Sequence, residues 1–236
     1  MSDPYPISSY SSSASGDATL LADRNRVLRN TYWLLALSLV PTVLGAWIGV
    51  VSGFTVLFQG SPWLSLLVFF GGAFALIWGI ERNKNSSIGV LLLLGFTFFM
   101  GLMLARLLVP ILGLRNGTSL ILTAFGGTAV IFAAMATLAT TIKRDLSGLG
   151  KFLLVGALIV MIGSIAGVFL QIPALTLTIL VLCLGIFSAY LLYDVNQVVR
   201  GGATNYVSAT LAIYLDVFNV FQSLLALLGI FGGERD

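Results

Sequence analysis

The sequence contains no histidine, a single cysteine and few charged residues. Without histidine there can be no serine–histidine triad, histidine zinc site or rhomboid-type serine–histidine dyad. Cys183 has no second thiol with which to form an intramolecular disulfide, and its apolar surroundings are typical of an inert cysteine. Only 9% of the 236 residues are charged, whereas ordinary soluble domains carry about 25%. This composition excludes a soluble globular protein.

Hydrophobic residues take the place of the missing charge and make up 58% of the chain. They form long tracts, each near the ~20 residues that cross a bilayer, with short charged clusters between them. The chain is therefore predicted to be an all-α polytopic membrane protein with one transmembrane domain, residues 23–236. The seven predicted spans are Tyr32–Val51, Trp63–Ile80, Ile88–Val109, Ser119–Thr141, Phe152–Leu170, Ala174–Tyr193 and Val207–Ile230.

Residues 1–22 are rich in serine and bury little, which predicts a disordered cytosolic tail. Basic residues gather on one face of the predicted membrane domain: Arg24, Arg26, Arg29, Arg82, Lys84, Lys143, Arg144, Lys151 and Arg200. The opposite face holds Arg106, Arg115 and Arg235. This bias predicts a cytoplasmic N-terminus and a C-terminus outside, and it explains the net charge of +3 without a nucleic-acid partner.

Asp216 lies near the middle of the last apolar tract. Inserting a carboxylate there costs at least ~2.5–3.5 kcal/mol, so the residue is a candidate functional group. Small and polar side chains at helical spacing predict that one stripe of this helix faces the bundle interior. The stripe comprises Ala209, Ala212, Asp216, Asn219, Ser223 and Ala226.

Asp194 ends the preceding tract, and the connection between the two is short, so the two acids are predicted to pair. Two carboxylates in a low-dielectric interior cannot both ionise cheaply, so the pair would share a proton or bind a cation weakly. Calcium is the hypothetical ligand, with Asn196, Asn219 and Ser223 as supporting polar groups. Arg82 is a possible latch, or else an arginine in solvent. The alternative for Asp216 is a structural role, satisfied by Asn, Tyr or Arg partners.

The run Leu211–Phe221 resembles the signature of the Bax-inhibitor (TMBIM) family, and Tyr193–Gln197 resembles the end of its sixth helix. Further segments are similar to the bacterial YccA group of that family: Arg26–Tyr32, Ala124–Ala129, Phe169–Leu175 and Gly201–Tyr206. The resemblance implies six helices around a central seventh in the bacterial inner membrane. It also implies a calcium leak gated by a di-aspartyl pH sensor, Asp194 and Asp216, and modulation of the FtsH protease, in which the N-terminal tail takes part.

Two functions remain open at this point: a pH-sensitive cation leak, and a protease-binding regulator without ion flux. A minor alternative is an intramembrane aspartyl protease, since Pro173–Leu175 spells its PAL triplet. That triplet precedes both acids, which is the wrong order. The chain is therefore expected to be no enzyme, with no resident cofactor beyond weakly bound calcium.

Overall fold

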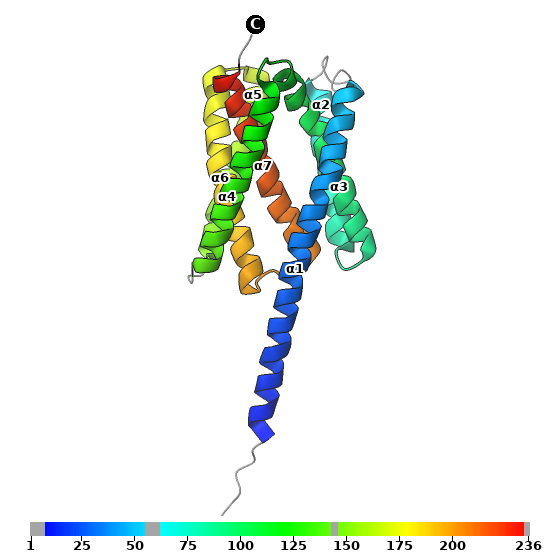
Figure 1. Ribbon diagram of the computed structural model, residues 1–236, viewed down its shortest axis with the longest axis vertical. Helices are drawn as coiled ribbons and strands as arrows, with labels where there is room; N and C mark the ends of the chain where they lie inside the picture. The colour runs from blue at the N-terminus through cyan, green and yellow to red at the C-terminus, as the bar shows by residue number, and fades with distance from the viewer. Residues whose placement is uncertain (1–7, 55–61, 143–145, 234–236) are drawn as a thin grey trace, which may run out of the picture.

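The computed structural model describes residues 8–54, 62–142 and 146–233, and these form seven α-helices without strands (Figure 1). All seven are long and apolar enough to cross a membrane, which confirms the predicted all-α polytopic class. Their bounds are α1 Ser8–Val51, α2 Pro62–Asn83, α3 Ser87–Leu112, α4 Gly117–Thr141, α5 Ser147–Leu170, α6 Pro173–Arg200 and α7 Tyr206–Gly232. Lys143, Arg144 and Arg235 of the charge argument lie outside the described residues.

The helices cross the membrane in alternating directions, which gives the bundle two ends. We call the end where α1, α3, α5 and α7 begin the tail side, and the opposite end the far side. Most predicted spans differ from the observed helices by a few residues. The largest differences are at the start of α1, the start of α5 and the end of α6, which continues to Arg200 instead of stopping at Tyr193. Asp194 therefore lies inside α6, roughly 9 Å before its last residue at 1.5 Å per residue.

The beginning of α1 differs from the predicted disordered tail. Residues 1–7 lie outside the described residues, but residues 8–22 are helical and continuous with the first span. In Figure 1 this part of α1 extends beyond the other helices on the tail side. Starting a helix is costly because several dihedral angles are fixed for the first hydrogen bond, whereas extending an existing helix adds one hydrogen bond for each residue fixed. The membrane span supplies that existing helix, and the amino-acid composition of the tail does not reveal this effect.

α7 occupies the centre of the bundle (Figure 1). It packs along α1, α3, α4 and α6 and touches α2 only slightly, whereas α5 packs mainly against α6. Its interior position is reflected in a long series of buried side chains, including Val207, Tyr214, Asp216 and Leu225. Five helices therefore surround α7 directly, and α5, the sixth helix of the ring implied by the family resemblance, lies on the outside of α6.

Close contact between α1 and α3 depends on glycines. A Cβ on Gly101 of α3 would clash with the backbone carbonyl oxygen of Thr42 in α1, and one on Gly45 would clash with the carbonyl oxygen of Phe98. Gly49 continues this face, and a Cβ there would lie 2.7 Å from the Ala105 Cβ. Gly53, four residues further along, falls after the helix, where its φ of 65° helps to end α1. Small residues thus let these two backbones approach closely.

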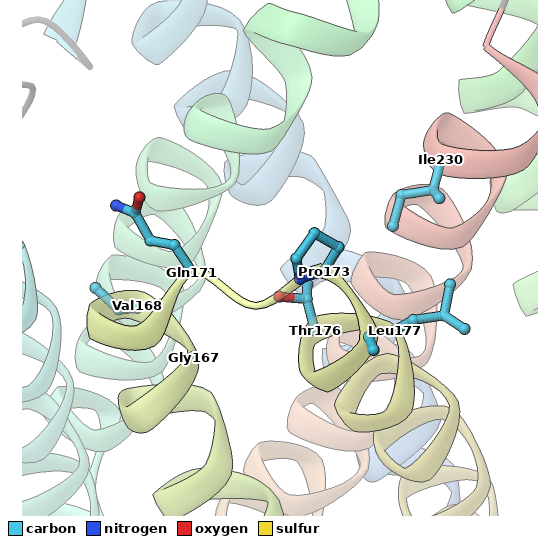
Figure 2. Close-up of a pocket in the computed structure, with 8 residues that line it drawn as sticks. Gly167, Val168, Gln171, Pro173, Thr176, Leu177 and Ile230 are labelled. Carbon is cyan, nitrogen blue, oxygen red and sulfur yellow. The ribbon is translucent and has the colours of Figure 1, made fainter.

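Two surface hollows lie on the far side and are lined mainly by apolar side chains. One, of about 630 Å³, lies at the α5–α6 connection beside Ile230 of α7 (Figure 2). The other, of about 580 Å³, lies between α2 and α5 near the Trp63–Phe169 ring contact. Neither hollow is lined by Asp194 or Asp216.

Candidate functional site

The connection between α6 and α7 fixes the positions of the two acids. Gly201 ends α6 with a φ of 80°, a conformation that glycine adopts without a Cβ penalty. The N–H groups of Gly202 and Ala203 then donate to the Gln197 carbonyl oxygen, at 2.9 and 3.2 Å. Asn205 caps α7, where its side-chain oxygen accepts from the N–H groups of Val207 and Ser208. This short, hydrogen-bonded turn makes α6 and α7 antiparallel neighbours.

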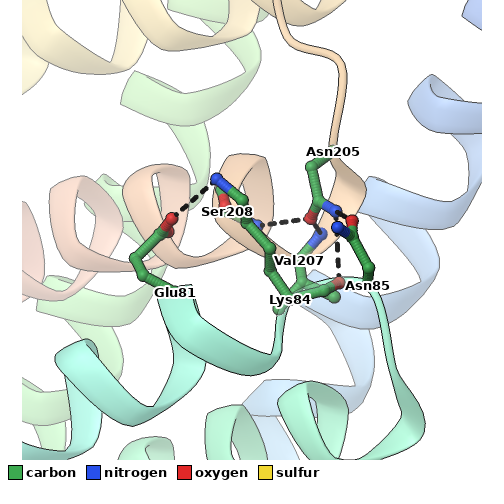
Figure 3. Close-up of polar contacts among 6 residues, drawn as sticks. All are labelled: Glu81, Lys84, Asn85, Asn205, Val207 and Ser208. Carbon is green, nitrogen blue, oxygen red and sulfur yellow. Dashed lines mark hydrogen bonds and ion pairs between the residues drawn. The ribbon is translucent and has the colours of Figure 1, made fainter.

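The start of α7 is also attached to the connection between α2 and α3 (Figure 3). The Asn205 amide donates to the backbone oxygen of Lys84 at 3.1 Å and to the side-chain oxygen of Asn85 at 2.8 Å. A single asparagine therefore caps the helix that carries Asp216 and holds the α2–α3 connection against it. The tail-side end of α7 is fixed by these bonds rather than left free.

The carboxyl groups of Asp194 and Asp216 lie close enough to interact with each other, so the predicted pairing is geometrically possible. Asp216 is only 3% exposed, and its Oδ2 atom has no hydrogen-bond partner, whereas Asp194 is half-buried. Among the described residues, the ion pair that the structure shows joins Lys84 to Glu81. No basic side chain in this part of the chain therefore forms an ion pair with Asp194 or Asp216. Two carboxylates ~4 Å apart repel by about 4 kcal/mol at an effective dielectric constant of ~20.

Tyr190 lies one turn before Asp194 on α6 and is close enough to interact with both carboxyl groups. The sequence argument did not single it out, although its spacing of four residues from Asp194 places both on one helix face. Its phenol adds a hydroxyl oxygen to those of the two acids. The described residues hold no cluster of three or more His, Cys, Asp or Glu side chains for a metal. A calcium ion here would therefore take most of its six to eight oxygens from water and the backbone.

The three supporting polar residues lie near the pair, but their side chains bond elsewhere. Asn196 donates to the Ala139 carbonyl oxygen of α4 at 2.9 Å, and Asn219 donates to that of Leu215 at 2.8 Å. Ser223, 2% exposed, contacts the thiol of Cys183. Asn196 and Ser223 therefore hold α6 against α4 and α7, and the carbonyl oxygen of the Asn219 side chain remains available.

A buried tyrosine on α7 forms a second polar centre that the sequence argument missed. The Tyr214 hydroxyl lies 2.9 Å from Thr42 Oγ1 of α1 and 3.4 Å from the Thr97 carbonyl oxygen of α3. Thr42 donates its own proton to the Ser38 carbonyl oxygen, so it accepts from Tyr214. The signal was available in principle, because a tyrosine hydroxyl buried among apolar residues needs a partner.

Arg82, the possible latch, is exposed in the last turn of α2. Its guanidinium lies over the ring of Trp78, 5.2 Å from the centroid. Arg106 of α3 is likewise exposed. Stacking of an arginine on a tryptophan is a favourable cation–π contact, and both residue types are favoured at a membrane–water boundary. The latch therefore stays a prediction, and this structure holds Arg82 in another contact.

The fold and site define a class: a seven-helix membrane protein whose central helix carries a buried acid paired with an acid on its neighbour. Residues 24–233 match the family described as inhibitors of apoptosis-promoting Bax1. The chain is 36% identical over 217 residues to the Escherichia coli K12 protein named modulator of FtsH protease YccA, covering 92% of this chain and 95% of that one. It is 33% identical over 208 residues to a Vibrio cholerae membrane protein, covering 88% and 91%. The chain belongs to the Bax inhibitor family.

Proposed function

We propose that this chain is a non-enzymatic, multi-pass protein of the bacterial inner membrane that leaks cations, calcium among them, under the control of the Asp194–Asp216 pair. The observation that carries the proposal is the buried Asp216 carboxyl group, in contact with a second acid and without a basic partner in the described residues. Such a pair is stable only with a shared proton or a bound cation.

Proton and cation therefore compete for one site. With the shared proton in place, the carboxyl groups bond to each other and hold α6 against α7. When the proton leaves, the two charges repel, and a cation that binds between them relieves the repulsion. Asp194 is the more exposed acid and lies nearer its helix end, so exchange with the tail side passes it first. By the distribution of basic residues, the tail side is the cytoplasm.

The test is calcium flux into proteoliposomes that contain the full chain. We expect Asp216→Asn to change the flux at least about tenfold and to flatten its pH dependence, because an amide cannot share or release the proton. The matched control is Glu81→Gln, which removes an acid from the exposed Lys84 pair outside the bundle interior. Equal calcium flux from the wild-type chain and Asp216→Asn would refute the di-aspartyl mechanism.

A second function, restraint of a membrane protease, is supported by the identity of 36% to the modulator of FtsH protease YccA. We propose that the two functions coexist, and that α1 supplies the contact with the protease on the tail side. The structural support is the extension of α1 from Ser8 beyond the bundle, where a cytoplasmic protein could reach it (Figure 1).

Co-purification with FtsH from detergent-solubilised membranes tests this proposal. We expect the full chain to retain FtsH and a variant lacking residues 1–22 to lose it, while both give the same thermal unfolding profile. The absence of any complex with the full chain, even after cross-linking in intact membranes, would exclude the protease function. Asp216→Asn serves as a control that should keep the complex.

A further inference from the structure

Gln222 is an exposed amide near the middle of a helix that is long and apolar enough to cross the membrane. It lies on α7 about 15 Å before the helix end at 1.5 Å per residue, well inside the ~30 Å hydrocarbon core. No hydrogen bond to its side chain occurs within residues 8–54, 62–142 and 146–233. A glutamine amide offers two donors and a carbonyl acceptor, and leaving them bare in hydrocarbon is costly. Water or a partner must therefore reach this side chain.

Gln222 shares a helix face with Ser208 and Leu215, since the three recur every seven residues. Asn205, at the start of α7, bonds to Lys84 and Asn85 directly after α2, and α2 and α7 are in contact. Figure 3 draws Ser208 in the same region as Glu81 and Lys84, which indicates that this face of α7 lies toward α2. Of the helices that contact α7, α2 has the smallest contact with it. The Ser208 hydroxyl is a second unsatisfied group on the same face, because its buried oxygen also lacks a hydrogen-bond partner.

The acid site adjoins this face. Asn219 lies between Asp216 and Gln222 along α7, and its amide N–H donates to Leu215 while its carbonyl oxygen remains available. The orphaned Oδ2 of Asp216, the Asn219 oxygen and the Gln222 amide therefore follow one another at steps of about 4.5 Å along the helix. Polar groups in this order lead from a buried carboxylate to an exposed amide.

We propose that the face of α7 toward α2 lines a water-filled track, and that Gln222 hydrates it on the far side of the acid pair. The track would admit water and hydrated cations. As a cation passes, oxygen atoms of Asp216, Asn219 and Gln222 replace the water oxygens that it loses. The role in cation passage rests on the proposed leak, whereas the presence of water does not. The other exposed faces of the bundle carry large apolar side chains, which are suited to contact with lipid tails.

Thiol accessibility tests the track without relying on ion flux. Starting from the full chain with Cys183→Ser, Gln222→Cys is treated in proteoliposomes with a charged, membrane-impermeant methanethiosulfonate. The matched control is Ile159→Cys, at similar depth on the exposed face of α5, and Thr176→Cys in the far-side hollow is the positive control. Ala226→Cys, one turn beyond Gln222, gives a second variant on the track.

We expect Gln222→Cys and Ala226→Cys to react at least about tenfold faster than Ile159→Cys, because the thiolate that reacts forms only in water. A rate equal to that of Ile159→Cys for both variants overturns the inference. So does a disulfide between two copies through Gln222→Cys without labelling, which would make this face a contact between chains.

The two proposals fail separately. Labelling of Gln222→Cys without calcium flux would keep the hydrated track and refute the leak. Flux without labelling would keep the leak and refute the track.

Discussion

The contact between α1 and α3 gives the sharpest stability prediction, the effect of Gly101→Ala. An added Cβ at Gly101 would clash with the carbonyl oxygen of Thr42 and lie 2.9 Å from the backbone nitrogen of Ala46. Both neighbours are backbone atoms of a helix, so neither can rotate away. Relief requires α1 and α3 to separate along their length, which also strains the Thr42–Tyr214 hydrogen bond.

The magnitude follows from two opposing terms. Alanine in place of glycine inside a helix gains about 0.8–1 kcal/mol of intrinsic propensity. Overpacking a well-filled contact typically costs about 1–3 kcal/mol, and a clash between backbones belongs at the upper end. We therefore expect a net loss of about 1–2 kcal/mol in the free energy of unfolding.

Gly95→Ala on the same helix is the matched control, because nothing lies within 4 Å of a Cβ at that position. It keeps the propensity gain and makes no clash, so we expect it to be neutral or stabilising. Thermal unfolding in one detergent, followed by tryptophan fluorescence, measures both variants. If Gly101→Ala unfolds at or above the wild-type temperature, the argument for close packing through glycine is wrong.

Three further predictions concern polar contacts. Tyr214→Phe should cost about 1 kcal/mol of unfolding free energy, because Thr42 keeps its bond to Ser38 and no buried group is orphaned; a loss above about 3 kcal/mol in chemical unfolding would show a larger role. Asn205→Ala should cost more, about 1–2 kcal/mol, since it removes both the α7 cap and the bonds to the α2–α3 connection; Asn205→Asp should recover the cap but not those bonds. Calcium binding to the full chain, measured by isothermal titration, should weaken as the pH falls, because protons compete for Asp216; a pH-independent affinity would place calcium elsewhere.

Much of the fold could be predicted because seven apolar tracts encode it directly. The far-side ends of α1 and α5 fall at the predicted Val51 and Leu170. The end of α6 was misplaced because Asp194, Asn196 and Gln197 look like a helix end, although polar residues near a membrane boundary can remain helical. The peripheral position of α5 could not be predicted either, because its apolar sequence does not specify which helix it packs against.

The closeness of the two acids could be predicted for a different reason. Asp194 and Asp216 stand out against apolar neighbours, and the short connection between their helices leaves few relative positions. What lies around them could not be inferred in the same way. Ser223 shares the predicted stripe with Asp216 but contacts Cys183, because the stripe specifies a direction and not a partner. Tyr214 lies outside the stripe, and its hydroxyl faces α1 and α3.

The bonds of Asn205 bear on whether Arg82 can reach the acids. Asn205 joins the start of α7 to Lys84 and Asn85, directly after α2, so the tail-side end of α2 cannot slide along α7 while these bonds persist. Asp216 lies roughly 15 Å along α7 from its start, deeper than the last turn of α2. Asp194 lies nearer the tail side and is only half-buried. If Arg82 leaves Trp78, Asp194 is therefore its accessible partner, and a latch onto Asp216 requires α2 to move.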